Sequence, residues 1–268
     1  MKLDDLPPAA AAAAAAGAHE VATEEAWREL HRAACAPYRL AGRFAGHFAR
    51  GKLARDPVFR GLLERGELPA GARVVDIGCG QGLLASLLQS CADLEKVGRW
   101  PLAWPTAPRA ASYLGIELMP RDAGRARRAT AALALAPAFE CADMRRAVLP
   151  PCELVVILDV LHYVDPAAQS ALLTRVRDAL LQGRGGRPRR LLLRVGDAAS
   201  RRGFAISQWV DRAVTLARGH KAAPTWGRPL ADWVALLQDL GFAVRCVPMS
   251  EGTPFANVLL VADVVGQA

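Results

Sequence analysis

Short runs of apolar residues alternate with longer amphipathic stretches from residue 73 to the end of the chain. Five runs are predicted as strands up to residue 195: "RVVDI", "SYLGIEL", "AFECAD", "CELVVIL" and "RRLLLRV". Apolar strands separated by longer helices predict an α/β fold with a mainly parallel sheet, covered by helices on both faces. The last two runs, "FAVRCVPM" and "NVLLVADVV", have no helix between them. We therefore expect them to form an antiparallel hairpin at one edge of the sheet.

Helix signals fill the spaces between these runs. Pro120 begins the stretch "PRDAGRARRATAALAL". Asp165 and Pro166 are a typical N-cap and first residue for "DPAAQSALLTRVRDALLQG". The stretches "GLLASLLQS" and "PLADWVALLQDLG" are also predicted as helices. The second of these carries an apolar stripe at helical spacing, formed by Leu230, Trp233, Leu237 and Leu240.

The pattern divides the chain into three parts. Residues 1–19 contain an alanine-rich stretch that we expect to be a disordered leader. The stretch differs from a signal peptide because two aspartates and a Pro-Pro pair stand where basic and leucine-rich regions belong. Residues 20–66 predict a helical preface, interrupted at Pro37, with Asp56 as a helix N-cap. Residues 67–268 then form the α/β domain.

Two stretches are too long for plain connections. Residues 92–110 contain two tryptophans and three prolines, and we expect a disordered loop there. Contact of Trp100 and Trp104 with a membrane surface or a carrier protein is the alternative for this stretch. Residues 196–228 leave the carboxyl end of the fifth strand, where open α/β sheets bind ligands, and are a lid candidate.

The cysteines, the net charge and the apolar runs limit the compartment and the kinds of partner that we expect. The six cysteines show neither CxxC pairs nor zinc-ligand spacing, which indicates reduced thiols in a cytoplasmic protein. The formal net charge is +8, and the last third of the chain, from Gln182, has 12 basic and 6 acidic residues. Such a surface attracts anions in general and selects no partner by itself. No apolar run is long enough to span a bilayer, so we expect any membrane contact to be peripheral.

The main candidate for a ligand-binding segment follows the first strand, in "VVDIGCGQG". Gly78 and Gly80 let the backbone turn sharply and approach a ligand closely. The next helix directs unpaired N–H groups to the same place, which favours an anionic group there. A dinucleotide fold has a third glycine where this chain has Leu83, which disfavours a nicotinamide cofactor.

"VVDIGCGQG" resembles the first motif of the class I S-adenosylmethionine-dependent methyltransferases, and the resemblance extends over residues 62–265. It implies a Rossmann-like fold and S-adenosylmethionine as the cofactor, with S-adenosylhomocysteine as the product. Glu117, which closes the second strand, would hold the ribose hydroxyls. Asp143 and Met144 would contact the adenine, and Leu158 would lie near the transferred methyl group. The implied cofactor contacts are Asp76, Gly78, Cys79, Gly80, Glu117, Leu118, Asp143, Met144 and Asp159.

Candidate catalytic residues follow the fourth strand, in "LDVLHYVD". His162 lies three residues past Asp159, and a histidine accepts a proton near neutral pH. Its alternative role is packing. Tyr163 is a second candidate, and we expect no metal because Asp165 is better explained as an N-cap. Five further residues are candidates for contact with the substrate or for a lid: Tyr38, Arg43, Phe204, Trp209 and Arg212.

The sequence constrains the identity of the methyl acceptor less than it constrains that of the cofactor. "LDVLHYVD" resembles the corresponding motif of small-molecule, quinone and lipid methyltransferases and lacks the [DN]-P-P-[YF] pattern of enzymes that methylate nucleobase amino groups. We predict a small-molecule acceptor, with oxygen of an aromatic or acidic metabolite as the first choice. A substrate attached to a carrier protein or associated with a membrane, carbon methylation of a quinone or lipid-like molecule, and RNA methylation remain alternatives. An NAD(P)-dependent oxidoreductase and a non-catalytic scaffold are more distant ones.

Overall fold

The computed structural model describes residues 8–184, 186–196, 225–251 and 257–265. Seven strands form one sheet: β1 (Ala72–Ile77), β2 (Ala110–Glu117), β3 (Ala138–Cys141), β4 (Leu154–Leu158), β5 (Arg190–Gly196), β6 (Phe242–Pro248) and β7 (Asn257–Val264). The helices are α1 (Pro8–Cys35), α2 (Arg43–Arg55), α3 (Pro57–Glu64), α4 (Leu83–Lys96), α5 (Pro120–Thr130), α6 (Pro166–Leu181) and α8 (Leu230–Asp239). Two 3₁₀ turns, η2 (Ala36–Arg39) and η3 (Leu161–Tyr163), complete the described elements.

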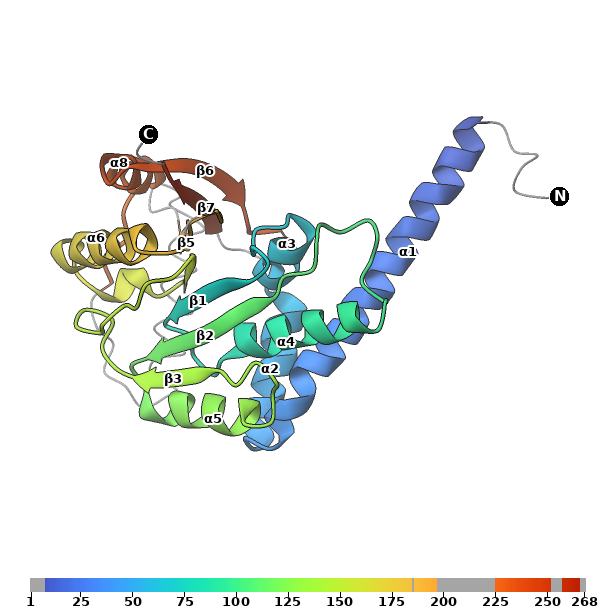
Figure 1. The fold of residues 1–268 in the computed structure, drawn as a ribbon, viewed down its shortest axis with the longest axis horizontal. Helices are drawn as coiled ribbons and strands as arrows, with labels where there is room; N and C mark the ends of the chain where they lie inside the picture. The colour runs from blue at the N-terminus through green and yellow to red at the C-terminus, as the bar shows by residue number, and fades with distance from the viewer. Residues whose placement is uncertain (1–7, 185, 197–224, 252–256, 266–268) are drawn as a thin grey trace.

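The strand order in the sheet is β3-β2-β1-β4-β5-β7-β6. Strands β1 to β5 are mutually parallel, and β7 runs antiparallel to both β5 and β6. The predicted α/β sheet with an antiparallel edge hairpin is therefore confirmed (Figure 1). The order reverses at β1, because β2 lies on one side of it and β4 on the other. Open α/β sheets bind ligands at the carboxyl ends of the strands beside such a reversal.

Two apolar clusters cover the two faces of the sheet. One packs α1 to α4 against Val74, Val156 and Leu192. The other packs α6 and α8 against their strand neighbours, including Val75 and Val155. Successive side chains of a strand point to opposite faces, so each unbroken apolar run supplies both clusters. This explains why these strands show no alternation of polar and apolar residues.

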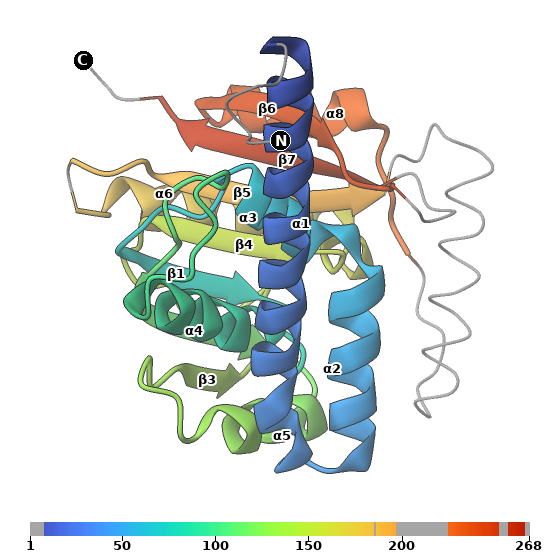
Figure 2. The ribbon, with the colours of Figure 1, turned by 90° about the vertical axis from the view of Figure 1, so that its right-hand side faces the viewer.

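The helical preface begins earlier than the sequence pattern predicts. α1 starts at Pro8, twelve residues before the predicted start of the preface, and the disordered leader over residues 1–19 stays a prediction. Alanine has the highest helix propensity of the residues, which favours continuation of the helix through the alanine run. The first turns of α1 project beyond the sheet and its covering helices (Figures 1 and 2). Asp56 caps α3 as predicted, accepting a hydrogen bond from Val58 N at 3.1 Å.

The tryptophan-containing stretch 92–110 is ordered, which corrects the expectation of a disordered loop. α4 continues to Lys96, and Trp104 is buried against the core. Trp100 packs edge to face on Trp104, with ring centroids 5.3 Å apart, and donates to Pro105 O at 2.8 Å. Two large rings with a satisfied N–H gain more from burial than from solvent exposure. Trp104 is thus buried and Trp100 half-buried, and contact of this stretch with a membrane surface or a carrier protein stays a prediction.

The second long stretch is described only at its ends. Residues 197–224, with Phe204, Trp209 and Arg212, lie outside the described residues. The returning chain at Trp226 donates its N–H to His162 O at 2.8 Å, which ties it to η3. Within the described ranges, none of the helices combines the length and apolar character needed to cross a membrane.

Candidate active site at the carboxyl ends of the strands

The turn between β1 and α4 contains three glycines with left-handed backbones: Gly78, Gly80 and Gly82, at φ of 73°, 57° and 74°. A Cβ on Gly78 would lie 2.6 Å from both methyl carbons of Val160, so this glycine lets the turn pack against the end of β4. A Cβ on Gly82 would lie 2.8 Å from the ring of Phe139. At Gly80, nothing within 4 Å would meet an added Cβ. Gly80 therefore borders open space, whereas its neighbours border protein.

The structure brings Glu117 to this turn, although 41 positions separate it from Asp76. Gly80 N donates to Glu117 Oε2 at 2.8 Å, and Met119 N donates to Oε1 at 2.8 Å. The intervening residues 97–109 pack elsewhere and leave the end of β2 beside the end of β1. Leu118, the next residue, is 59% exposed.

Asp76 lies beneath the turn and is buried. Tyr113 Oη donates to Asp76 Oδ2 at 2.5 Å. Burial disfavours the charged carboxylate, and the nearby Glu117 adds to the effect, so the pKa of Asp76 is raised to about 7 even though the bond from Tyr113 lowers it. Burial also raises the pKa of the half-buried Cys79 thiol, which stays protonated. Both side chains support the turn from below.

The end of β3 lies beside the end of β2, because Ala142 N donates to Glu117 O at 3.0 Å. Asp143 forms an ion pair with Arg145, whose Nε donates to Oδ2 at 2.8 Å, and this bond lowers the pKa of Asp143. Met144 is half-buried and packs against the second apolar cluster. The two predicted adenine contacts therefore stand at the predicted strand end, with Asp143 already paired.

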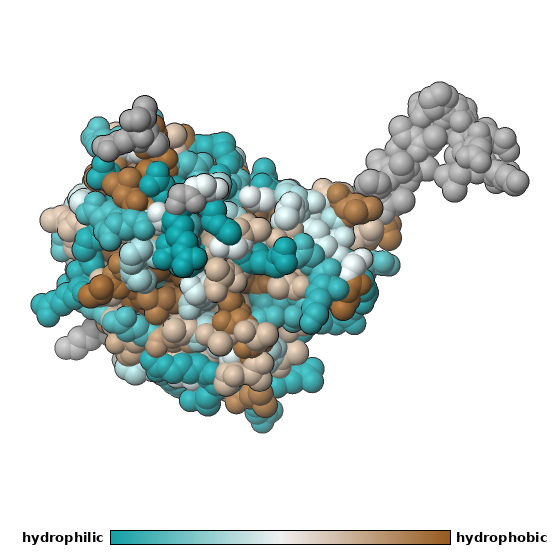
Figure 3. All heavy atoms as spheres, viewed as in Figure 1, coloured by the Kyte–Doolittle hydropathy of each residue, from teal (hydrophilic) through white to brown (hydrophobic). Residues whose placement is uncertain are grey.

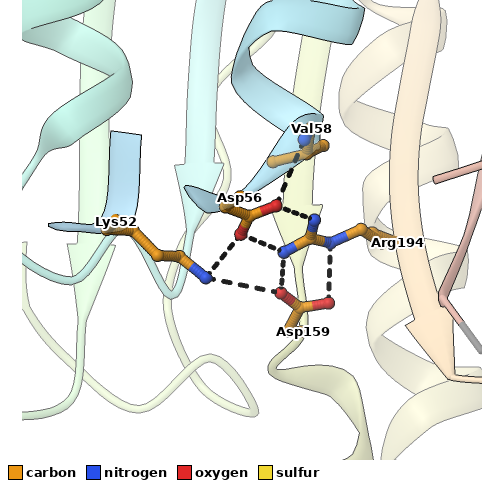
Figure 4. A network of polar contacts seen from close by, with 5 residues as sticks. All are labelled: Lys52, Asp56, Val58, Asp159 and Arg194. Carbon is orange, nitrogen blue, oxygen red and sulfur yellow. Dashed lines mark hydrogen bonds and ion pairs between the residues drawn. The ribbon is translucent and has the colours of Figure 1, made fainter. Parts of the chain in front are cut away.

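A network of ion pairs joins the ends of β4 and β5 to the helical preface (Figure 4). Arg194, on β5, is only 2% exposed and lies between the carboxylates of Asp56 and Asp159. Its Nε donates to Asp159 Oδ1 at 2.8 Å, and its Nη2 donates to Asp56 Oδ2 at 2.7 Å. Lys52 Nζ lies 2.6 Å from Asp56 Oδ2 and 3.9 Å from Asp159 Oδ2. Two cations thus balance two carboxylates.

The network keeps Asp56 and Arg194 charged and holds the backbone of Asp159 in place. Burial opposes the charge of Asp56, but the bonds and charge of Arg194, together with Lys52, hold its pKa well below the usual range. Burial likewise opposes the charge of Arg194, but Asp159 and Asp56 raise its pKa. Asp159 has a left-handed backbone, at φ of 58°, which is uncommon for a residue other than glycine. Such backbone strain persists where the surrounding contacts hold a residue in place.

The two catalytic candidates lie on η3, next to this network. The rings of His162 and Tyr163 are adjacent, with centroids 4.2 Å apart. His162 is half-buried, whereas Tyr163 is 39% exposed. Leu158, at the end of β4, is partly buried against the first apolar cluster.

The two candidate residues of the helical preface, Tyr38 and Arg43, differ in their exposure. Tyr38 is fully buried beneath the glycine turn, and its hydroxyl donates to Gln81 O at 2.8 Å. This bond ties Tyr38 to the turn, and its role in a lid or in contact with the substrate stays a prediction. Arg43 is exposed in the first turn of α2.

Two residues near the site, Gln81 and Arg194, were not predicted from the sequence. Gln81 is buried and donates to Asp122 Oδ1 at 3.1 Å, and within the described part of the chain its Oε1 lacks a hydrogen-bond partner. Arg194 does carry a signal in retrospect, because an arginine inside the apolar run "LLLRV" requires a buried partner. The described residues contain no group of three or more metal-ligating side chains.

Comparisons with known proteins support this description at the level of fold. No protein-family model and no curated protein sequence matches the chain. Magnesium protoporphyrin IX methyltransferase from Synechocystis PCC 6803, with bound S-adenosylhomocysteine, matches at a TM-score of 0.53 and 20% identity, covering 85% of this chain and 92% of that one. An O-methyltransferase family protein from Burkholderia thailandensis matches at 0.55 and 17% identity, with coverages of 86% and 63%.

A third solved structure is N,N-8-amino-8-demethyl-D-riboflavin dimethyltransferase from Streptomyces davawensis, at a TM-score of 0.52 and 19% identity. It covers 83% of this chain, and the chain spans 58% of it. Each comparison covers more than four fifths of the chain, and all three proteins are methyltransferases. The chain thus has the fold of the class I S-adenosylmethionine-dependent methyltransferases.

Proposed function

We propose that this protein is an S-adenosylmethionine-dependent methyltransferase that acts on a small molecule. The observation that carries the proposal is the pairing of Gly80 with Glu117 at the reversal of the strand order. Gly80 borders open space that a side chain would fill, and a carboxylate lies 2.8 Å from its N–H. Backbone that a ligand approaches closely, beside a carboxylate, suits a ribose-containing cofactor.

The residues present fit this cofactor. A carboxylate accepts about four hydrogen bonds, enough for two backbone N–H groups and two ribose hydroxyls, which suits Glu117. Asp143 and Met144, at the end of the neighbouring strand, would hold the adenine. Gln81 offers a buried acceptor oxygen beside the same turn. Asp76, Cys79 and Tyr38 would act from below, keeping the turn in the shape that receives the cofactor.

When bound, the cofactor supplies an electrophilic methyl group on a sulfonium, and the protein has to align a nucleophile with it and exclude water. Asp159 is held rigidly by Arg194 at the end of β4, where it can orient an acceptor. His162, three residues further on, would accept the proton from an acceptor hydroxyl as the new bond forms. Tyr163, more exposed, would contact the acceptor from the solvent side.

Oxygen of an aromatic or acidic metabolite is the acceptor that we propose. A hydroxyl must lose a proton on methylation, and His162 is a base of suitable strength on the acceptor side. The names of the similar structures include an O-methyltransferase family protein and an amino-riboflavin dimethyltransferase, so nitrogen is the alternative that they support.

Transfer of labelled methyl groups to matched acceptors tests the proposal. We expect protein supplied with labelled S-adenosylmethionine to label 4-hydroxybenzoate more than 4-aminobenzoate, and label on benzoate measures transfer to a carboxylate oxygen. His162→Ala should lower kcat by about a hundredfold, the usual scale for a general base, and leave the affinity for the cofactor unchanged. Preferential labelling of the amine, or full activity of His162→Ala, would contradict the oxygen acceptor and the role of His162.

A further inference from the structure

Two described segments contain many more basic than acidic residues. Residues 36–55, which form η2 and α2, contain five arginine and lysine residues and no acidic residue. α5 contains four arginines and one aspartate. Together these segments carry a net charge of +8, equal to the formal net charge of the whole chain. The rest of the chain is therefore neutral in sum.

The two segments adjoin each other. The guanidinium of Arg125, on α5, lies 4.4 Å from the centre of the Phe44 ring, on α2. Arg125 is itself buried and paired with Asp122 at 3.0 Å. α5 and the η2 turn lie together at the lower end of the molecule in both ribbon views (Figures 1 and 2). We call η2, Leu40, the first turn of α2 and α5 the basic corner.

The basic corner also exposes apolar side chains. Leu40 is 74% exposed and Phe44 is 52% exposed, and they lie on either side of Gly42. Phe44 stacks on Phe48, with ring centroids 6.3 Å apart and planes within 8° of parallel. Figure 3 shows hydrophobic atoms beside hydrophilic ones at this lower end. The exposed cations on η2, the first turn of α2 and α5 are Arg39, Arg43, Arg121, Arg127 and Arg128.

We propose that the basic corner docks on an anionic lipid bilayer. Arginines on a surface are attracted to anionic headgroups, and apolar side chains between them enter the boundary of headgroups and acyl chains. Leu40 favours a bilayer over a nucleic acid, because an aliphatic side chain has no group that binds a phosphate or stacks on a base. The association is peripheral, and it does not depend on the proposed methyl transfer.

Sedimentation of the full chain with vesicles tests the proposal. We expect the protein to sediment with equimolar phosphatidylglycerol and phosphatidylcholine and to stay in solution with phosphatidylcholine alone. Each exposed arginine replaced by glutamine should lower the partition coefficient about fivefold, because one cation near an anionic surface contributes about that factor. Leu40→Ser and Phe44→Ser should lower it further. Added salt should weaken binding by screening the charges.

Matched control variants lie elsewhere on the surface. Leu102 is fully exposed, and Arg65 is exposed at the end of α3. Leu102→Ser and Arg65→Gln should sediment like the unaltered protein, and thermal unfolding of each variant checks that it is folded. Three outcomes would overturn the proposal: no sedimentation with anionic vesicles, equal sedimentation with neutral ones, or equal loss in the controls. Binding of single-stranded RNA through the same arginines without vesicle binding would also overturn it.

Discussion

Asp159 and Arg194 hold each other through both main chain and side chain. Asp159 N donates to Arg194 O at 3.3 Å, and Arg194 Nε donates to Asp159 Oδ1 at 2.8 Å. Arg194 also reaches Asp56, which begins α3 in the preface. The end of β4 is therefore fixed to the N-terminal helices by one buried cation.

Removing that cation should be costly. Arg194→Met keeps much of the side-chain volume but leaves the carboxylates of Asp56 and Asp159 facing each other. We expect the free energy of unfolding, measured by urea denaturation at pH 7, to fall by about 3–5 kcal/mol. Adding Asp56→Asn and Asp159→Asn to that variant should restore most of the loss. Arg55→Met, at an exposed position of α2, is the control, and a loss there as large as at Arg194 would contradict the account.

The raised pKa of Asp76 predicts a dependence of stability on pH. The folded state binds the proton more tightly than the unfolded state, in which the usual value is 3.8. The stabilisation is therefore complete below about pH 4 and is lost as the pH rises to about 7. The loss amounts to at most about 4 kcal/mol, at about 1.4 kcal/mol for each unit of pKa.

Asp76→Asn keeps an acceptor for the Tyr113 hydroxyl and removes this titration. Urea denaturation of both proteins, without ligand, between pH 4 and pH 8 measures the difference. We expect the free energy of unfolding to fall less steeply with pH in Asp76→Asn than in the unaltered protein. Parallel curves for the two proteins would show that Asp76 does not titrate in this range.

Substitutions at two glycines of the turn should affect different properties: stability at Gly78, and ligand binding at Gly80. Gly78→Ala would force a Cβ against Val160 and should destabilise the fold by several kcal/mol. Gly80→Ala meets open space and costs only the left-handed backbone, about 1–2 kcal/mol. We expect Gly80→Ala to unfold near the usual temperature and to bind S-adenosylhomocysteine at least tenfold more weakly. Unchanged affinity in Gly80→Ala would show that the open space is not the cofactor site.

The buried hydroxyl of Tyr38 should matter for the shape of the turn. Tyr38→Phe removes its hydrogen bond to Gln81 O and leaves that buried carbonyl unsatisfied, which costs about 1–3 kcal/mol. We also expect the Kd for S-adenosylhomocysteine to rise severalfold, because the turn becomes less well fixed. Tyr163→Phe, which changes a more exposed ring, should leave the free energy of unfolding unchanged. If both variants lose the same stability, the bond from Tyr38 is not the cause.

Local patterns in the sequence predicted the sheet and the caps well, because strand runs, Asp56 and Asp165 depend on neighbouring residues. The placement of Glu117 also followed from its position at a strand end. The partner of Arg194 did not, because Asp56 lies 138 positions away and only the folded preface brings it near. The same holds for the bond from Tyr38 to Gln81 O, which joins residues 43 positions apart. Trp104 is buried, and Trp100 partly buried, by contacts that no local pattern in the sequence predicts.

Calorimetric titration of the full chain with S-adenosylhomocysteine tests the central claim most directly, because the product binds without an acceptor. We predict saturable binding of one equivalent with a micromolar Kd, and no binding of NAD or NADP under the same conditions. Absence of binding by S-adenosylhomocysteine, or binding of a nicotinamide cofactor in its place, would contradict the assignment of the glycine turn and Glu117 to a methyltransferase site.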